Sequence, residues 1–249
     1  MTGSGMKIRE LNDMAQLEEC AEVQEKVWGI SKVDVIPTHL MRAYTDPQDT
    51  WGILLGAYVD GKMVGISFTL PTARADTYLL HMIGVLPDYQ HQNIGHNLLL
   101  VTEDMSRKRG TRKIVLTYDP LESVNANLYL NKHGGICRSY AVDYYRVYGS
   151  RTHSGFPADR FKVEIFTDKR DREKVVSPSS VRKTIEIEIP TNFQQLKAQH
   201  IQNAIDWRHR TRDLFSRYIN EEGYIATTFT GNYGRGTGKY LLEKPITEK

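Results

Sequence analysis

The segment from His81 to Leu100 reads HMIGVLPDYQHQNIGHNLLL, and it decides the fold. An apolar run ends at Val85, a polar turn spans Gln90 to Gly95, and a second apolar run begins at Leu98. This order predicts a strand, a loop and a helix. The unpaired N–H groups at the start of a helix attract phosphate or pyrophosphate, and the helix dipole adds to that attraction. The segment therefore predicts an anion-binding loop.

The composition is that of an ordinary globular protein. The chain has 249 residues, 40% of them hydrophobic and 25% charged, with a formal net charge of +3. A charge this small does not indicate a nucleic-acid partner. Residues 150–249 hold 18 Lys and Arg against 13 Asp and Glu. This basic half is either a solvated surface or one that attracts an acidic substrate.

The chain has two cysteines, Cys20 and Cys137, which lie far apart and form no metal-binding pattern. The N-terminal residues lack the apolar stretch of a secretory leader. No run of about 18 apolar residues is present, so no membrane span is predicted. We therefore expect a cytoplasmic protein that contains no metal and does not act at a membrane.

Alternation and helical spacing predict a mixed α/β layer fold in the first half. Asp60-Gly61 predicts the turn of a hairpin, and Asp13 predicts the cap of the first helix. The expected strands are 7–11, 52–59, 62–70, 77–85, 113–118 and 137–148. The expected helices are the one after Asp13, 33–44, 95–109 and 123–133.

The second half is harder to interpret. Residues 161–166 and 184–190 alternate like strands, and 168–183 is the best candidate for a linker. Residues 193–221 predict two helices or one broken helix, and 224–229 with 238–242 predict a closing hairpin. The order strand, helix, strand, strand suggests a truncated copy of the first half, although no repeat is visible in the residues themselves. We divide the chain into domains at 6–150 and 151–249.

Two blocks, GVLPDYQHQNIGHNLL and SVNANLYLNKHGG, together resemble the GNAT superfamily of N-acetyltransferases over residues 6–150. The first block resembles the family's acetyl-CoA pyrophosphate loop, usually written Q/R-x-x-G-x-G/A. It departs from the pattern at Asn93, where the family prefers Gly. Asn is the next most tolerant residue for left-handed backbone, so the loop can still form.

The resemblance implies a GNAT-like central sheet, mixed but mostly antiparallel and flanked by helices, with a C-terminal α/β extension. It implies that acetyl-CoA is the co-substrate. The residues that it implies for CoA binding are Gly84, Val85, Gln90, His91, Gln92, Asn93, Ile94, Gly95, His96 and Asn125. Structural readings remain open for two of them, since Asn125 can simply start a helix and Gly95 can simply permit close packing.

The resemblance extends over nearly the whole chain. Tyr118-Asp119-Pro120-Leu121, the stretch from Gly155 to Phe161, and Trp207-Arg208 followed by Thr211-Arg212 resemble an uncharacterised branch of predicted GNAT acetyltransferases. That branch also carries a C-terminal extension. The likeness does not identify the acceptor, which could be a small-molecule amine or a peptide.

Acetyl transfer needs a neutral amine, a polarised thioester and a proton for the departing thiolate. The resemblance assigns Tyr129 as the general acid, and a phenol suits this role because its pKa of about 10 exceeds that of a thiol. A core tyrosine is the structural alternative. No Glu lies between Val64 and Val85, where many family members place the general base.

His81 is the best substitute as a base, and strict alternation places it on the face of Ile83 and Val85. A hydrogen-bonded core histidine is the alternative. Asp119 and Glu122 are further acidic candidates for the base, although Asp119-Pro120 also suits a turn.

Three arginines are candidates for acceptor binding. Arg208 and Arg212 lie four residues apart on one predicted helix and could grip a carboxylate or phosphate together. The alternative is that they pair with Asp206 and Asp213 on a solvated helix face. Arg160 likewise either binds an acidic group of the acceptor or pairs with the neighbouring Asp159.

The leading hypothesis is an acetyl-CoA-dependent N-acetyltransferase that works by direct attack in a ternary complex. A different acyl-CoA donor, or a CoA-binding module without catalysis, are the alternatives. A homodimer formed through the closing hairpin is possible. We expect neither nucleic acid nor a membrane as a partner.

Overall fold

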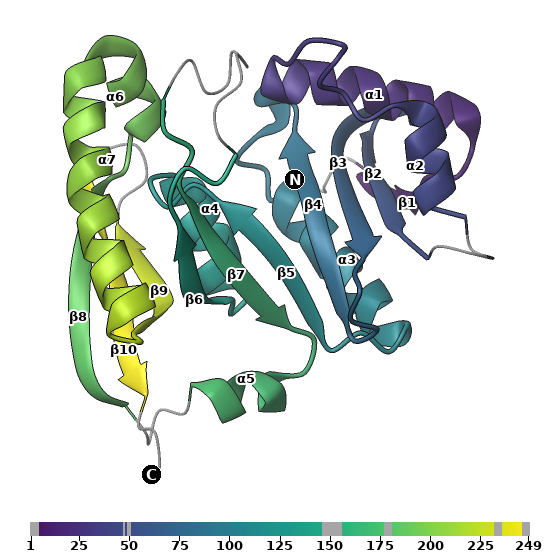
Figure 1. The fold of residues 1–249 in the computed structure, drawn as a ribbon. Coiled ribbons are helices and arrows are strands. Elements are labelled where there is room, and N and C mark those ends of the chain that lie inside the picture. Colours follow the sequence, from purple (N-terminus) through teal and green to yellow (C-terminus); the bar gives the residue numbers. More distant parts are fainter. Residues whose placement is uncertain are drawn as a thin grey trace. The chain divides into compact units, whose positions relative to one another are not determined.

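The computed structural model describes residues 5–46, 48, 51–145, 156–176, 181–231 and 236–245. The described residues form two compact units, one up to Ile114 and one from Val115 onward (Figure 1). Both units combine a sheet with helices, as the α/β fold class predicts. Within the described ranges, no helix has the length and apolar character that a membrane span requires.

The first unit is built on an antiparallel sheet in the order β1-β2-β3-β4. Its strands are β1 (Lys7–Glu10), β2 (Ile53–Val59), β3 (Lys62–Pro71) and β4 (Thr77–Val85). The predicted hairpin turn is confirmed, because Asp60 and Gly61 have φ of 49° and 84°. Such a two-residue turn needs positive φ at both positions.

Helices cover both faces of this sheet. They are α1 (Met14–Trp28), α2 (Thr38–Tyr44) and α3 (Ile94–Lys108). Asp13 caps α1 as predicted, by accepting a hydrogen bond of 2.9 Å from the Ala15 N–H. On the α3 face, the Ser67 and Thr102 hydroxyls lie 3.0 Å apart. On the α1 face, Gly84 leaves space for Trp28, since a Cβ at Gly84 would approach that ring to 2.8 Å.

A β-bulge interrupts β4 at His81. Phe68 of β3 pairs with Met82, and the next residue of β3 pairs two positions further back, so His81 has no partner across the ladder. The His81 ring lies 6.4 Å from the Phe68 ring in an edge-on contact. His81 therefore shares the face of Phe68, whereas Ile83, whose partner adjoins Phe68, lies on the other face. The predicted alternation is wrong here, because a bulge adds one residue to the strand.

The second unit contains six strands, of which β5 begins just before Val115. They are β5 (Lys113–Tyr118), β6 (Ile136–Ala141), β7 (Arg160–Phe166), β8 (Val181–Pro190), β9 (Ile225–Gly231) and β10 (Thr237–Pro245). Their order is β5-β7-β6-β9-β10-β8. Counted outward from the centre, β6, β7 and β5 mirror β9, β10 and β8. The unit therefore consists of two half-sheets with the same strand order, which meet at β6 and β9.

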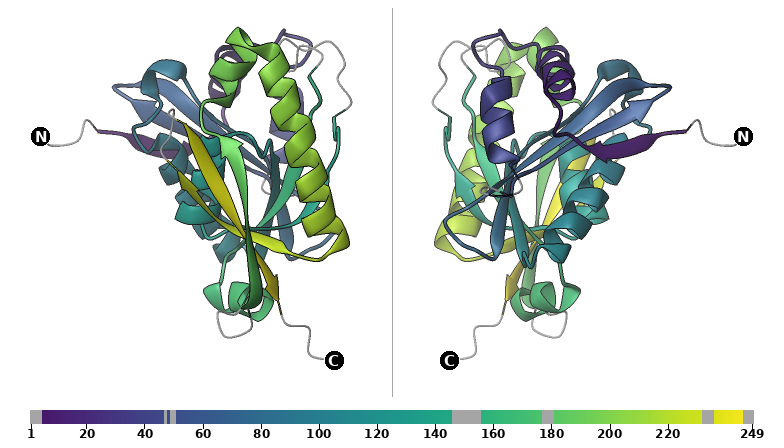
Figure 2. Two further views of the ribbon diagram at one scale, coloured as in Figure 1. Left: turned by 90° about the vertical axis from the view of Figure 1, so that its left-hand side faces the viewer. Right: turned by 90° about the vertical axis from the view of Figure 1, so that its right-hand side faces the viewer.

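The helices follow the same order. In the first half, α4 (Ser123–Ala126) runs into the π-helical segment η2 (Asn127–Lys132) before β6. In the second half, α7 (Ile201–Phe215) runs along β8 and into the π-helical segment η4 (Ser216–Glu221) before β9 (Figure 2). Both segments close with the same hydrogen bond of 2.8 Å, from Gly135 N–H to Tyr129 O and from Tyr224 N–H to Tyr218 O.

The shared order also reveals a repeat in the sequence. NLYLNKHGGI at 127–136 and SRYINEEGYI at 216–225 share Tyr, Asn, Gly and Ile at equivalent positions. Only these four of the ten positions agree, and for this reason the strand order, rather than the residues, suggested a copy. The order of β8, α7, β9 and β10 follows that of β5, α4, β6 and β7, of which β5, α4 and β6 lie within residues 6–150 and β7 lies beyond them.

Two asparagines join the half-sheets reciprocally. Only Cys137 and Ala226 pair directly between β6 and β9. Beyond that pair, Asn131 donates to Phe229 O at 2.6 Å and accepts from Phe229 N–H at 3.0 Å. Asn220 likewise donates to Tyr140 O at 2.8 Å and accepts from Tyr140 N–H at 3.0 Å. Each amide thus takes the place of a peptide group at the edge of the opposite half-sheet.

Several predicted boundaries need correction. The predicted linker contains helix α5 (Lys169–Val175), which Asp168 caps by accepting from the Arg170 N–H at 2.9 Å. The strand expected over 137–148 ends at Ala141, and the helix expected over 123–133 becomes π-helical from Asn127. Between β8 and α7 lies the short helix α6 (Phe193–Gln199). The compact units divide near Val115 rather than at 150, and the division into domains at 150 stays a prediction.

Candidate active site

The predicted anion-binding loop follows β4 in the first unit. A single 3₁₀ turn, η1 (Pro87–Tyr89), precedes it, and α3 begins at Ile94. Asn93 adopts the left-handed conformation with φ 61° and ψ 13°, which the sequence analysis required of it. His91 is also left-handed, with φ 62°, which the sequence did not signal.

The loop opens directly into the helix. The first regular helical hydrogen bond runs from Asn97 N–H to Asn93 O at 2.9 Å. The N–H groups of Ile94 and Gly95 therefore precede the helical ladder and point out of the helix N-terminus. Two left-handed residues beside a helix N-terminus make the concave array of N–H groups that suits an anion.

The end of β4 offers backbone groups of its own. Leu86 N–H donates to Val64 O of β3 at 2.8 Å. Because an antiparallel ladder alternates, Gly84 also directs its N–H toward β3, whereas the N–H and C=O of Val85 point away from it. The Gln90 side chain donates to Val85 O at 3.2 Å and so ties the loop to the strand. Val85 is therefore better placed than Gly84 to donate to a ligand.

Tyr129 and Asn125 lie in the second unit. Tyr129 is buried in the π-helical segment η2, and its ring lies 5.3 Å from that of Tyr118. Burial raises the pKa of Tyr129 above its usual value, so its hydroxyl keeps its proton at neutral pH. Asn125 is half-buried on α4. π-helical turns are frequent at functional sites, which fits a role for this segment.

His81 is exposed on the face that β4 shares with Phe68. Partial desolvation lowers the pKa of its imidazole, so the ring is neutral at pH 7 and can accept a proton. None of the described residues donates a hydrogen bond to the ring or accepts one from it.

A charged cluster follows β5 in the second unit. Asp119 accepts a hydrogen bond from Leu121 N–H at 2.9 Å and an ion-pairing one from Arg208. Arg208 is fully buried, with its guanidinium carbon 5.3 Å from the centre of the Phe156 ring and 5.5 Å from that of Phe193. Sequence reasoning missed this pairing, because Asp119 and Arg208 lie far apart in the chain.

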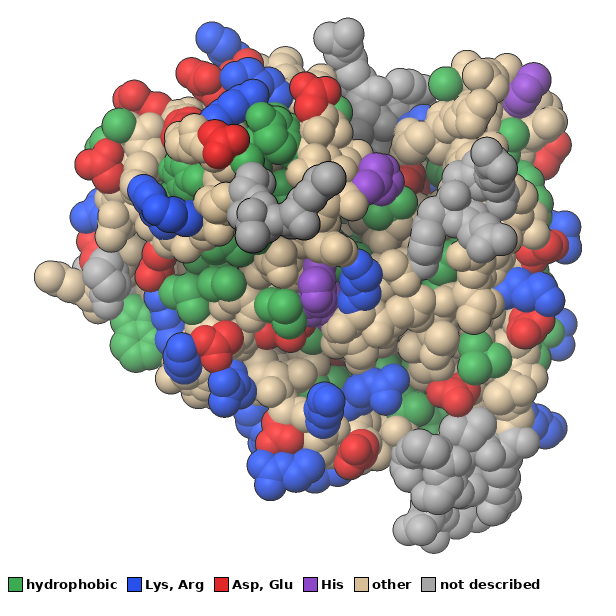
Figure 3. Space-filling model, turned by 180° about the vertical axis from the view of Figure 1, so that it is seen from behind, with side chains coloured by type: hydrophobic (Ala, Val, Ile, Leu, Met, Phe, Trp, Pro, Cys, Tyr) green, Lys and Arg blue, Asp and Glu red, His purple; other side chains and the backbone are tan. Residues whose placement is uncertain are grey.

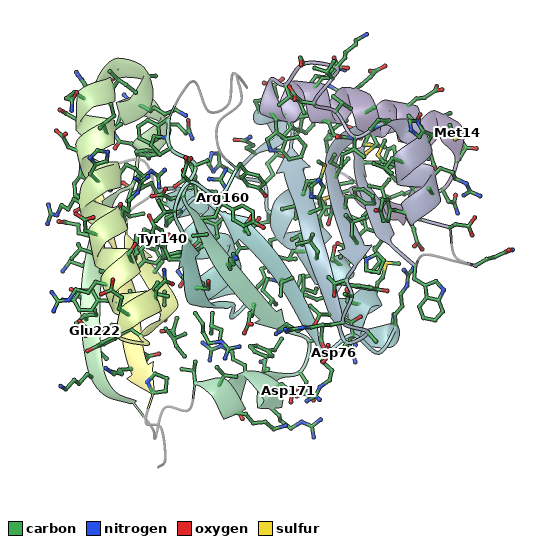
Figure 4. The ribbon with its side chains drawn as sticks, viewed as in Figure 1. Met14, Asp76, Tyr140, Arg160, Asp171 and Glu222 are labelled. Carbon is green, nitrogen blue, oxygen red and sulfur yellow. The ribbon has the colours of Figure 1, made fainter. Side chains whose placement is uncertain are left out.

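The other two arginines are engaged as well. Arg212 donates to both Asp159 oxygens, at 2.9 and 2.8 Å, and Tyr140 donates to the same carboxylate. Burial alone would raise the pKa of Asp159, but these hydrogen bonds hold it below its usual value. Arg160, at the start of β7, lies 3.9 Å from Asp119 (Figure 4).

The structure thus separates Arg208 and Arg212, which hold different carboxylates. They do not form a joint grip on an anion, and their partners are not Asp206 and Asp213.

The surface shows no single charge pattern on the side in Figure 3, where basic and acidic side chains are interspersed. Among the described residues, no group of three His, Cys, Asp or Glu side chains could hold a metal ion.

The comparisons with known proteins agree with the fold. Residues 13–134 match the model of the acetyltransferase (GNAT) family. A search of curated proteins finds no match.

Similar solved structures include the ribosomal-protein-S18-alanine N-acetyltransferase of Escherichia coli. It is 18% identical with a TM-score of 0.53, and the match covers 66% of this chain and 95% of that one. A GNAT acetyltransferase of Streptococcus pneumoniae is 19% identical with a TM-score of 0.53, covering 65% and 99%. YncA of Salmonella typhimurium, solved with its cofactor acetyl-CoA, is 18% identical with a TM-score of 0.53, covering 66% and 95%.

At these identities the solved structures show a shared fold, and the family model adds the enzyme class. The match spans the loop at Gln90 to Gly95 and the helical segment that holds Tyr129, the two places on which the sequence resemblance rests. Residues 13–134 therefore form an acetyltransferase domain of the GNAT family.

Proposed function

We propose that the protein transfers an acetyl group from acetyl-CoA to a primary amine, by direct attack of the amine within a ternary complex. The observation that carries this proposal is the left-handed conformation of Asn93 at the start of α3. It supports a pyrophosphate loop, because Asn93 takes the backbone conformation that the family's glycine would allow at that position.

The loop residues fit the pyrophosphate of CoA. The N–H groups at the start of α3 would bind its oxygens, together with those of His91, Gln92 and His96 from the same segment. The Gln90 N–H already donates to Pro87 O at 3.2 Å, so Gln90 would act by holding the loop to Val85 through its side chain. The Val85 N–H would donate to the thioester carbonyl as an oxyanion donor. Asn125 would contact the pantetheine arm.

Tyr129 would donate its proton to the thiolate of CoA. Its high pKa suits this step, because a phenol that stays protonated is available as an acid. Cys20 and Cys137 are buried and their pKa values are raised to about 12 by burial, so neither provides a ready thiolate for a covalent intermediate. Direct attack follows from this.

The acceptor is a small-molecule or peptide amine. Arg160 stays our candidate for contacting an acidic group on it, since Arg208 is sealed inside the protein and Arg212 is occupied by Asp159. Another acyl-CoA donor would use the same loop, and comparing rates across acyl chain lengths distinguishes it.

Calorimetric titration with acetyl-CoA, followed by a panel of amines, tests the proposal. We expect micromolar binding and acetylation of at least one amine. Tyr129→Phe should lose most of the turnover and keep its affinity for CoA, while Tyr44→Phe, at an exposed position, should behave as the unaltered protein. Full activity of Tyr129→Phe would refute the acid role. Binding without transfer to any amine would favour a non-catalytic CoA-binding module.

A further inference from the structure

The turn between β5 and α4 carries two carboxylates in different surroundings. Asp119 O accepts a hydrogen bond from Glu122 N–H at 2.9 Å, and Glu122 O in turn accepts one from Ala126 N–H at 3.0 Å. Together with the bond from Leu121 N–H to the Asp119 side chain, these contacts fix the turn. Two acidic side chains are thus held at one short turn at the end of β5.

The Asp119 carboxylate interacts with two arginines of the protein. Arg208 donates to its Oδ2, and Arg160 lies 3.9 Å from the same oxygen. The Nε and Nη1 atoms of Arg208 are buried and have no hydrogen-bond partner among the described residues. Among those residues, Asp119 is therefore the one side chain to which Arg208 donates a hydrogen bond. These contacts with Arg208 and Arg160 fix the position of the Asp119 side chain.

Glu122 is not paired with any cation among the described residues. Its carboxylate accepts a hydrogen bond from the amide of Gln194 on α6, which belongs to the C-terminal extension. The side chain is half-buried, so it can still meet a ligand. A neutral amide can hold a carboxylate in place without cancelling its charge.

The surroundings also set the proton affinity of Glu122. Burial raises its pKa to about 7, and the negative charge of Asp119 adds to this, while the Gln194 hydrogen bond and the charges of Lys197 and Arg208 act in the opposite direction. A carboxylate with a pKa near 7 is suited to accept a proton at neutral pH.

We propose that Glu122 is the general base, which takes the proton from the ammonium group of the acceptor, and that Gln194 positions it. This inference rests on the proposed function. His81 is the weaker candidate, because the bulge turns it onto the face of Phe68 and none of the described residues orients its ring.

The proton balance is complete. The ammonium group gives one proton to the Glu122 carboxylate and becomes a neutral amine. The amine nitrogen attacks the thioester carbon, so that a C–N bond forms and the C–S bond breaks. Tyr129 gives its proton to the sulfur and recovers one, through solvent, from the nitrogen as the amide forms. Glu122 then releases its proton to solvent.

The test measures the pH dependence of kcat/KM for Glu122→Gln, using the best acceptor from the amine panel. The wild-type rate should fall below a pH of about 7, where Glu122 becomes protonated. Glu122→Gln keeps an oxygen that accepts from Gln194, so the turn should stay folded. We expect a loss of about 100-fold at pH 7. The loss should shrink as the pH approaches the pKa of the amine, because less of the acceptor then needs a base.

Two further variants separate catalysis from structure. Glu173→Gln makes the same chemical change on the exposed side of α5 and should leave the profile unchanged. Gln194→Ala removes a hydrogen bond to the charged form of Glu122, so the acid limb should move to higher pH. A purely structural role would lower the rate without moving the limb.

The outcomes distinguish the inference from the proposed function. If the wild-type protein acetylates no amine, the proposed function fails and the inference fails with it. If it is active and Glu122→Gln retains both rate and profile, only the inference is overturned. A lost acid limb in His81→Gln, with a normal one in Glu122→Gln, would overturn it in favour of His81.

Discussion

Replacing Asn220 by alanine should open the seam between the two half-sheets of the second unit. The change removes the hydrogen bonds of 2.8 and 3.0 Å that the amide makes with the backbone of Tyr140, a residue that is 4% exposed. Each such bond contributes about 1 kcal/mol net. We therefore expect a loss of about 2 kcal/mol in the free energy of unfolding. Asn131→Ala should cost a similar amount through Phe229.

Urea unfolding measures the total loss, and amide hydrogen exchange locates it. A loss of 2 kcal/mol corresponds to about a 30-fold faster exchange. Asn220→Ala should accelerate hydrogen exchange at the Tyr140 amide, and Asn131→Ala should accelerate it at the Phe229 amide. Asn203→Ala is the matched control, because Asn203 is exposed on α7.

Two results would refute this reasoning. The first is a loss below about 0.5 kcal/mol in both variants, which would mean that water replaces the amide at no cost. The second is equal acceleration of both amides in each variant, which would mean that the seam opens as a whole rather than at the altered end.

Three further predictions concern the loop, the sheet and the acidic turn. Asn93→Val should bind acetyl-CoA about tenfold more weakly, since a β-branched residue pays roughly 1–2 kcal/mol in left-handed backbone, while Asn93→Gly should bind normally. Equal calorimetric affinities for the two variants would contradict this. Gly84→Ala should destabilise the protein by about 1–3 kcal/mol in urea unfolding, because its Cβ would lie 2.8 Å from Trp28. Gly65→Ala, whose closest contact would be 3.1 Å, should cost less, and the reverse order would contradict the packing argument. Glu122→Gln should become more stable than the wild type as the pH rises. The pKa of about 7 in the folded protein lies above the usual value of 4.5, so the contribution of Glu122 to stability is full below pH 4.5 and is lost as the pH rises through 7. Thermal unfolding should show a gain of about 3 kcal/mol at pH 8 and none at pH 4, and a pH-independent difference would exclude the raised pKa.

Local patterns predicted the first unit well. The Asp60-Gly61 turn, the Asp13 cap and the limits of β4 each depend on residues that are close in the sequence. The left-handed conformation of Asn93 was likewise predictable, because few other residues tolerate it. The bulge at His81 was not predictable. It arises from the pairing of β4 with β3, and the pattern of apolar and polar residues in β4 does not show it.

Contacts between distant residues were the harder part. The ion pair of Arg208 with Asp119 joins positions in the two half-sheets, and helical spacing suggested neighbours on the same helix instead. The π-helical turn at Tyr129 and the helix α5 were also missed, because both depend on packing more than on intrinsic preference. The site residues are thus recognisable singly, whereas their partners emerge only from the fold.

The reciprocal asparagines have a consequence for assembly. A sheet grows between two molecules when each offers an unsatisfied strand edge to the other. One side of β6 is taken by β7, and the other by Ala226 and the Asn220 amide, so this strand has no edge to offer to a second copy. The second half-sheet covers this side of β6 from within the same polypeptide. This coverage is intramolecular, so it does not depend on the protein concentration.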